Sequence, residues 1–251
     1  MMVFVSGMIC TLGLFAGLLG CIAWARTHWQ IHPELCRKTA HVVMGMACMT
    51  FPGFVAGKWQ ILLLAGVFIA ALGWMRRSSS PRVMGADVFR VSRARSIGEY
   101  HFVVGVAAAF VLADGDWFAY AAAISFLAFA DAAACAVGRL RGRNRCWGNS
   151  KTLEGSLAFI AVAALCVLAL IVWTGTSPGF AACASLCLIA TVAEGFSTRE
   201  SDNLLVPLAS VVCLRLPDWL PVQVGAGFWL TALVGLGGTL AVRMVRRAPA
   251  F

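Results

Sequence analysis

The sequence predicts an all-α integral membrane protein, a polytopic bundle of about nine helices that forms a single domain over residues 1–251. Hydrophobic residues make up 61% of the 251 residues and charged residues only 12%, whereas soluble domains contain about 45–50% apolar and about 25% charged residues. Long apolar runs with almost no charge recur along the whole chain, and short blocks of basic residues separate them. Segments that face lipid have this composition.

The apolar runs define the predicted membrane spans, which are 3–25, 40–57, 59–75, 97–113, 117–137, 153–173, 180–196, 204–216 and 224–242. The first run lacks the basic start and the cleavage site of a signal peptide, which predicts a retained span. The eighth run is shorter than the ~20 residues of a full crossing and contains Pro207, which is typical of a tilted, broken or re-entrant segment.

The basic residues predict the topology. If every run crosses, all 20 basic residues except Lys58 and Arg215 fall in alternate loops on one side of the membrane. Basic loops stay in the cytosol, so the amino terminus is predicted outside and the carboxyl terminus in the cytosol. This distribution explains the net charge of +9 without a nucleic-acid partner. The longest loop, 76–96, is predicted to be a solvated cytosolic connector beside anionic headgroups.

The cysteines are predicted to be small packing residues. Most of the ten lie inside apolar runs, and none forms a CxxC pair. This placement favours neither a disulfide framework nor a cysteine metal site.

A first polar cluster leads into the second run and contains Glu34, Arg37, Lys38 and His41. Arg37 and His41 share a helix face at i, i+4, and Lys38 lies three residues before His41. Adjacent Arg and Lys side chains can clamp a phosphate. A basic anchor at the membrane surface would explain Arg37 and Lys38 but not His41, one turn deeper. Both interpretations stay open on these residues alone.

A second cluster begins at Asp131, in an otherwise uncharged run. A carboxylate inside a membrane is costly, so it indicates a functional site, with a structural ion pair to a loop arginine as the alternative. Gly138 lies seven residues further on nearly the same helix face, where the missing side chain lets a ligand or a neighbouring backbone approach.

The segment after Asp131 has the chemistry of a phosphate site. Asn149 or Ser150 can cap the sixth helix, whose first turn then offers free N–H groups to an anion, with Lys151 beside them. The segment 148–152 lacks the glycines of a Walker loop, so no soluble nucleotide-binding fold is predicted.

Carboxylates near these basic residues predict a magnesium site, because Mg²⁺ uses one or two carboxylates together with phosphate oxygens and water. Asp131 is the leading ligand, and Glu154, Glu194 and Asp202 are further candidates. Asp202 could instead cap the eighth helix. Glu194 or Asp202 could also accept the proton of an attacking alcohol.

The order and spacing of these residues resemble the CTP-dependent lipid-alcohol kinases, a family of dolichol kinases, phytol and farnesol kinases and the yeast-type diacylglycerol kinase, related to the membrane cytidylyltransferases. The matching pieces are Glu34…Arg37-Lys38…His41, Ile97-Gly98-Glu99-Tyr100, Asp131 to Gly138 with Arg139, Lys151-Thr152-Leu153-Glu154-Gly155-Ser156, and Glu194 followed by Asp202-Asn203 and Pro207. They cover residues 34–207, which the resemblance implies to be the catalytic core.

The resemblance implies transfer of the terminal phosphate of CTP, taken from the cytosol, to the hydroxyl of a lipid alcohol in the bilayer, with Mg²⁺ as cofactor. The catalytic residues implied are Arg37, Lys38 and Asp131. Nucleotide contacts are implied at Arg37, Lys38, Gly138, Arg139, Lys151 and Thr152, with further site positions at His41, Glu99 and Asn203. The active site would then lie on the cytosolic face.

Two alternatives remain beside the kinase. A cytidylyltransferase is less favoured because the signature of the phosphatidate cytidylyltransferases is absent from residues 194–251. A transporter is less favoured because no internal repeat is evident and the charges gather at one interface. Phytol, a polyprenol and diacylglycerol all suit the same apolar lining, so the sequence leaves the acceptor open, together with the nucleotide and the oligomeric state.

Overall fold

The computed structural model of the chain describes residues 2–29, 33–77, 97–145, 147, 150–198 and 201–219. Within these ranges every regular element is a helix, which confirms the predicted all-α class. The elements are α1 (Met2–Trp29), α2 (Pro33–Cys48), the 3-10 turn η1 (Phe51–Gly53), α3 (Lys58–Arg77), α5 (Gly98–Ala113), α6 (Trp117–Ser125), the π-helical turn η2 (Phe126–Ala130), α7 (Asp131–Arg141), α8 (Leu153–Thr174), α9 (Phe180–Phe196) and α10 (Asp202–Trp219).

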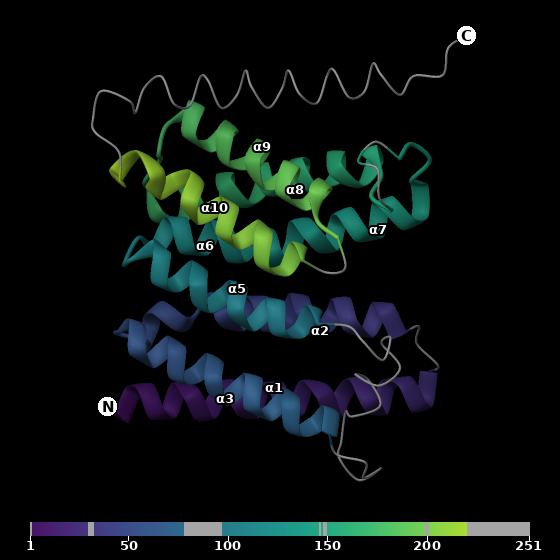
Figure 1. Ribbon diagram of the computed structural model, residues 1–251, viewed down its shortest axis with the longest axis vertical. Helices are drawn as coiled ribbons and strands as arrows, with labels where there is room; N and C mark the ends of the chain where they lie inside the picture. Colours follow the sequence, from purple (N-terminus) through teal and green to yellow (C-terminus); the bar gives the residue numbers. More distant parts are fainter. Residues whose placement is uncertain are drawn as a thin grey trace.

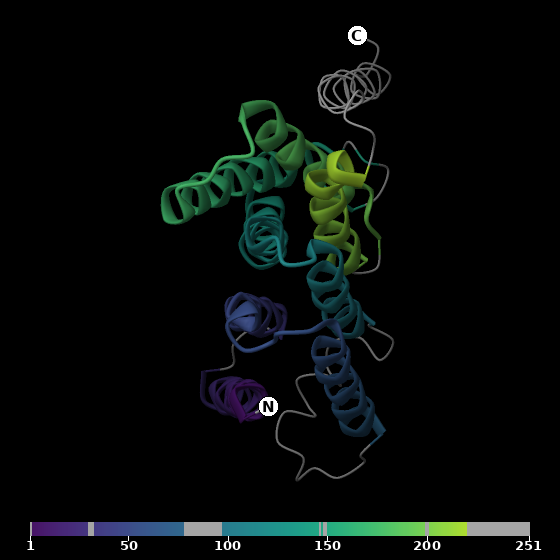
Figure 2. The same ribbon diagram turned by 90° about the vertical axis from the view of Figure 1, so that its left-hand side faces the viewer.

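Successive helices run antiparallel, and α6, η2 and α7 form one long helix (Figure 1). Figure 2 shows two layers, with α3, α5 and α10 in one and α1, α2 and the α6–α7 helix in the other.

Four stretches are long and apolar enough to cross a membrane: Met2–Ile22, Lys58–Arg77, Trp117–Arg141 and Leu153–Thr174. Helices α5 and α9 are apolar but shorter. The predicted span 224–242 and most of the predicted connector 76–96 lie outside the described residues, so a count of nine stays a prediction.

One end of the bundle carries most of the charge, and we call it the basic end. The carboxyl ends of α1, α3, α7 and α9 and the amino ends of α2, α5, α8 and α10 lie there, on the right of Figure 1. In the part of the chain that is described, Lys58 and Arg215 lie toward the opposite end. The charge asymmetry predicted from the sequence therefore appears as two distinct ends of the fold.

Helix α2 corrects the predicted second span, because it runs from Pro33 to Cys48 rather than over 40–57. Proline suits the first turn of a helix, where its missing N–H has no partner to lose. The helix therefore includes the charged segment, which hydropathy alone excludes. A second proline, Pro52, lies in η1, and because it has no N–H the α-helix cannot continue through it.

Helix α10 corrects the expectation of a broken eighth segment, because its 18 residues continue through Pro207. Pro207 has no N–H to donate to the carbonyl of Asn203, four residues earlier. Gly105 of α5 approaches this carbonyl closely, since a Cβ built on Gly105 would lie 2.3 Å from the oxygen. The missing side chain thus lets α5 pack directly over the weakened turn of α10.

The centre of the bundle is the long helix of α6, η2 and α7. Alanines on several of its faces are fully buried, which lets the neighbouring helices approach closely. The π-helical turn ends at Ala130, directly before Asp131. Single π-helical turns inside α-helices occur frequently at functional sites.

Candidate functional site

The first pair of charges at the basic end joins α2 to α7. The Lys38 ammonium donates a hydrogen bond to Oδ2 of Asp131 and forms a salt bridge with it. The Asp131 side chain is only 2% exposed. The predicted functional carboxylate is therefore paired with the lysine of the first cluster, 93 residues away in sequence, rather than with a loop arginine.

A second group of charges joins the starts of α8 and α10 to the end of α9. Lys151 Nζ lies 2.5 Å from Oε1 of Glu194 and 2.8 Å from Oδ2 of Asp202. Both carboxylates are buried. The second oxygen of Glu194, Oε2, is buried without a hydrogen-bond partner among the described residues. Asp202 uses its other oxygen, Oδ1, to accept the N–H of Asn203 at 3.0 Å.

Electrostatics links the two groups. Burial lowers the pKa of Lys151, but the charges of Asp202, Glu194 and Asp131 outweigh it and hold the pKa above its ordinary value. Lys151 is therefore a permanent cation at physiological pH. We call Lys38, Asp131, Lys151, Glu194 and Asp202 the ionic cluster. With all five ionised, it carries two positive and three negative charges.

The turn before α8 corrects the predicted cap. Thr152 is the N-cap, and its hydroxyl accepts the N–H of Gly155 at 3.2 Å. Ser150 lies before the cap, and Asn149 is outside the described residues. Lys151 therefore directly precedes the first turn of α8, close to the positive end of its dipole.

Gly138 lies at the contact between α7 and α8. A Cβ there would lie 3.1 Å from Oγ1 of Thr152 and 3.7 Å from Cα of Gly155. Of the two expectations for Gly138, the approach of a neighbouring backbone is therefore the one seen. Its packing against Thr152 positions Lys151 beside α7.

Four other residues singled out in the sequence do not belong to the ionic cluster. Glu154 accepts hydrogen bonds from Asn144, including one of 2.8 Å from the side-chain amide. Arg139 is exposed. The side chains of Glu34 and Arg37 lie outside what the structure describes, although α2 places both residues at the basic end.

His41, Glu99 and Asn203 line an apolar pocket next to the cluster. His41 stacks edge-on against Phe102, with ring centroids 4.5 Å apart. Glu99 pairs with Arg76 at 2.6 Å. Asn203 donates from its amide to the carbonyl of Gly98 at 2.9 Å.

Sequence reasoning missed Trp147. Its indole N–H donates to Oγ of Ser156 at 2.8 Å, and its ring packs against Gly195 and Phe196. It therefore holds the α7–α8 loop against the end of α9, next to Glu194. A tryptophan in a basic loop was the available signal, but Gly195 and Phe196, against which it packs, are distant in sequence.

The carboxylates of the ionic cluster offer oxygens of the kind that Mg²⁺ binds. Mg²⁺ takes carboxylate, water and phosphate oxygens, and the unpartnered Oε2 of Glu194 is an oxygen of this kind. In the described part of the chain, no group of three His, Cys, Asp or Glu side chains could hold a metal ion by itself. A cation here would therefore use one or two of Asp131, Glu194 and Asp202.

Comparison with known proteins leaves this site without an assigned relative: no family model, no curated protein and no solved structure matches the chain. The fold and the site thus define the class of protein: a helical bundle, with helices apolar enough to cross a membrane, in which two lysines pair with buried carboxylates at the basic end.

Proposed function

We propose that the protein is a CTP-dependent kinase that phosphorylates the hydroxyl of a lipid alcohol. The observation that carries the proposal is the ionic cluster, which lies beside the polar end of an apolar pocket. The spacing of the cluster residues along the sequence, which resembles the lipid-alcohol kinases, supports the same reaction.

Phosphoryl transfer requires mainly positioning and neutralisation of charge, rather than covalent chemistry by the protein. Lys38 and Lys151 would bind phosphate oxygens, and Arg37 at the start of α2 would add a third cation. Asp131 and Glu194 would hold Mg²⁺, which when bound neutralises charge on the nucleotide phosphates.

The ion pairs support an exchange of partners when substrate binds. Each lysine now neutralises carboxylates that are too buried to remain charged alone. When nucleotide and metal enter together, the carboxylates would turn to the metal and the lysines to the phosphates. Every buried charge would then stay paired throughout.

The substrates and the cluster account for every bond and proton of the proposed phosphoryl transfer. The lipid hydroxyl oxygen would attack the terminal phosphorus of CTP, the bond from that phosphorus to the bridging oxygen would break, and CDP would leave. Asp202 is our choice of proton acceptor, because it lies at the start of α10 next to the pocket-lining Asn203.

The basic end would face the cytosol, which supplies the nucleotide. We test this by placing single cysteines at Arg143 and Asp116 in a cysteine-depleted protein and labelling intact cells or oriented vesicles with an impermeant maleimide. We expect Asp116→Cys to react from outside and Arg143→Cys only after permeabilisation. Labelling of both from the same side would contradict the topology.

One observation favours a second candidate, transport of a cation or small solute. Asp131 lies roughly 15 Å from the end of α7, by the helical rise of 1.5 Å per residue, and buried carboxylates at such depth also mark transport pathways. A phosphate-transfer assay combined with a vesicle uptake assay separates this candidate from the kinase.

The deciding experiment uses purified protein in nanodiscs with CTP, Mg²⁺ and a panel of lipid alcohols. CTP labelled in the terminal phosphate should give a labelled lipid phosphate and CDP. If, with phosphatidate in place of the alcohols, only CTP labelled in the α-phosphate labels the lipid and diphosphate is released, the protein is a cytidylyltransferase. If neither label reaches lipid while vesicles containing the protein take up a cation, the transport candidate replaces the kinase.

A further inference from the structure

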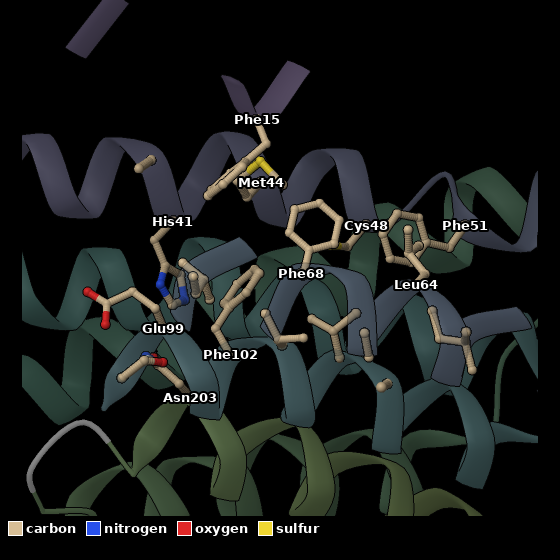
Figure 3. A pocket seen from close by; sticks show the side chains of 18 of the residues that line it. Phe15, His41, Met44, Cys48, Phe51, Leu64, Phe68, Glu99, Phe102 and Asn203 are labelled. Atoms are coloured by element: carbon tan, nitrogen blue, oxygen red, sulfur yellow. The ribbon is translucent and has the colours of Figure 1, made fainter. Parts of the chain in front are cut away.

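An elongated apolar pocket lies between the two layers of the bundle. Helices α1 and α2 form one wall and α3 and α5 the other (Figure 3). Aromatic and aliphatic side chains dominate the lining, among them Phe15, Met44, Leu64, Phe68 and Phe102.

The two ends of this pocket differ in polarity. His41, Glu99 and Asn203 lie together at one end, and Phe51 and Leu64 lie at the other (Figure 3). A molecule that matches this gradient has one polar end and a hydrocarbon body.

The polar end of the pocket adjoins the ionic cluster through two helices. His41 lies one turn after Lys38 on α2, and Asn203 directly follows Asp202 on α10. A hydroxyl at this end would therefore be close to the groups to which we assign phosphate binding and proton transfer.

The pocket is long and narrow. Its lining on α5 extends from Gly98 to Ala107, which is about 13 Å at the helical rise of 1.5 Å per residue. Its volume is about 100 Å³. A cavity of about 150 Å³ is known to take one benzene molecule, so a volume of this size spread over such a length admits a single file of carbon atoms.

We propose that this pocket takes the hydrocarbon chain of a single-chain lipid alcohol, with the hydroxyl at the His41–Asn203 end. The first carbons of the chain would fill the pocket, and the rest would extend into the bilayer. This inference rests on the proposed function and narrows it, because diacylglycerol would have to insert two chains where one fits. The pocket thus selects against two-chain acceptors.

A pair of matched variants on α3 tests the pocket. Ala65 lines it, whereas Ala70 on the same helix is exposed. Ala65→Phe should block the pocket, and Ala70→Phe adds the same side chain outside it. Ala107→Leu narrows the pocket from α5 and serves if Ala65→Phe does not fold.

The readout is photolabelling of purified protein, without nucleotide, by a C20 isoprenoid alcohol carrying a diazirine near its hydroxyl. We expect labelled peptides from α2 and α5 around His41 and Phe102. Ala65→Phe should reduce this labelling at least tenfold and Ala70→Phe less than twofold. Excess unlabelled single-chain alcohol should compete, and diacylglycerol should not.

Three results would overturn the pocket assignment: labelling confined to other helices, equal labelling of the two variants, or competition by diacylglycerol as strong as by the single-chain alcohol. Because no nucleotide is present, the outcome is independent of catalysis. Pocket labelling without phosphoryl transfer would remove the proposed kinase and leave the pocket standing. Transfer of phosphate to diacylglycerol as fast as to the single-chain alcohol would keep the kinase and remove the proposed selectivity.

Discussion

Lysine–carboxylate pairs of similar length occur at both ends of the bundle, in opposite surroundings. At the end opposite the basic end, Lys58 lies 2.6 Å from Asp114, and the two side chains are 54% and 58% exposed. At the basic end, Lys151 lies 2.5 Å from Glu194, which is 3% exposed. Water screens the first pair, so it contributes little, whereas the second cannot lose a partner without leaving a buried charge.

The neighbouring groups extend this contrast. Asp116, at the end opposite the basic end, caps α6 by accepting the N–H of Ala119 at 2.9 Å, and its other oxygen lies 3.9 Å from Arg215 of α10 in a partly exposed pair. The ionic cluster instead brings together α2, α7, α8, α9 and α10. Distance alone therefore does not distinguish the two ends, while burial and the number of elements joined do.

The largest expected effect is at Asp131. Asp131→Asn keeps the side-chain volume but removes the charge that pairs with Lys38 and would hold Mg²⁺. We expect turnover to fall by at least about 100- to 1000-fold, the usual cost of losing one preorganised electrostatic group. Turnover is measured over a magnesium titration, with size-exclusion profiles to show that the variant is folded. Near-normal activity at any magnesium concentration would remove the metal role.

A smaller effect is expected at Lys151. Lys151→Met should cost about 1.5–3 kcal/mol of charge-assisted bonding, or roughly 10- to 150-fold in kcat/KM. Lys151→Arg, which keeps the charge, should recover part of this loss. Arg143→Met removes an exposed charge of the same loop and should cost less than about 1 kcal/mol. Equal losses in Lys151→Met and Arg143→Met would mean that the loop is only a membrane anchor.

The smallest effect is expected at the exposed pair. A hydrogen bond from Lys58 and its charge hold the pKa of Asp114 below the ordinary value of 3.8. The pair therefore adds stability above that pH and loses it only as the pH falls through the lowered pKa. We expect Lys58→Met to leave activity and thermal stability unchanged between pH 6 and 8. A loss of activity or of thermal stability as large as in Lys151→Met would contradict the difference proposed between the two ends.

Hydropathy predicted most helices because their limits are set locally. For α8 the predicted 153–173 compares with the observed Leu153–Thr174, since Thr152 caps its start and Gly175, at φ +67°, ends it. The apolar run 40–57 fits α2 less well, because the charged first turns of the helix lower its hydropathy and the chain stays apolar after the helix ends at Cys48.

The sequence located the charges of the site but not their partners. Carboxylates and lysines near the ends of apolar runs were recognisable, and the antiparallel fold explains why they reach the same end. That Lys38 pairs with Asp131, and Lys151 with Glu194 and Asp202, depends on how the helices pack. Trp147 was missed for the same reason, because its role depends on Gly195 and Ser156.

The π-helical turn η2 also sets the angular phase of the long central helix. It places Phe126 to Ala130 on a wider turn directly before Asp131. If these five residues formed an ordinary α-helix instead, with none deleted, every residue after them would rotate by about 100° about the helix axis, because a π-turn holds about one residue more than an α-turn. Asp131 would then turn away from Lys38, although the hydrophobicity of the segment would hardly change. A substitution that converts η2 into a regular α-helix could thus remove this site while leaving the apolar character of the segment, and hence its insertion into the membrane, intact.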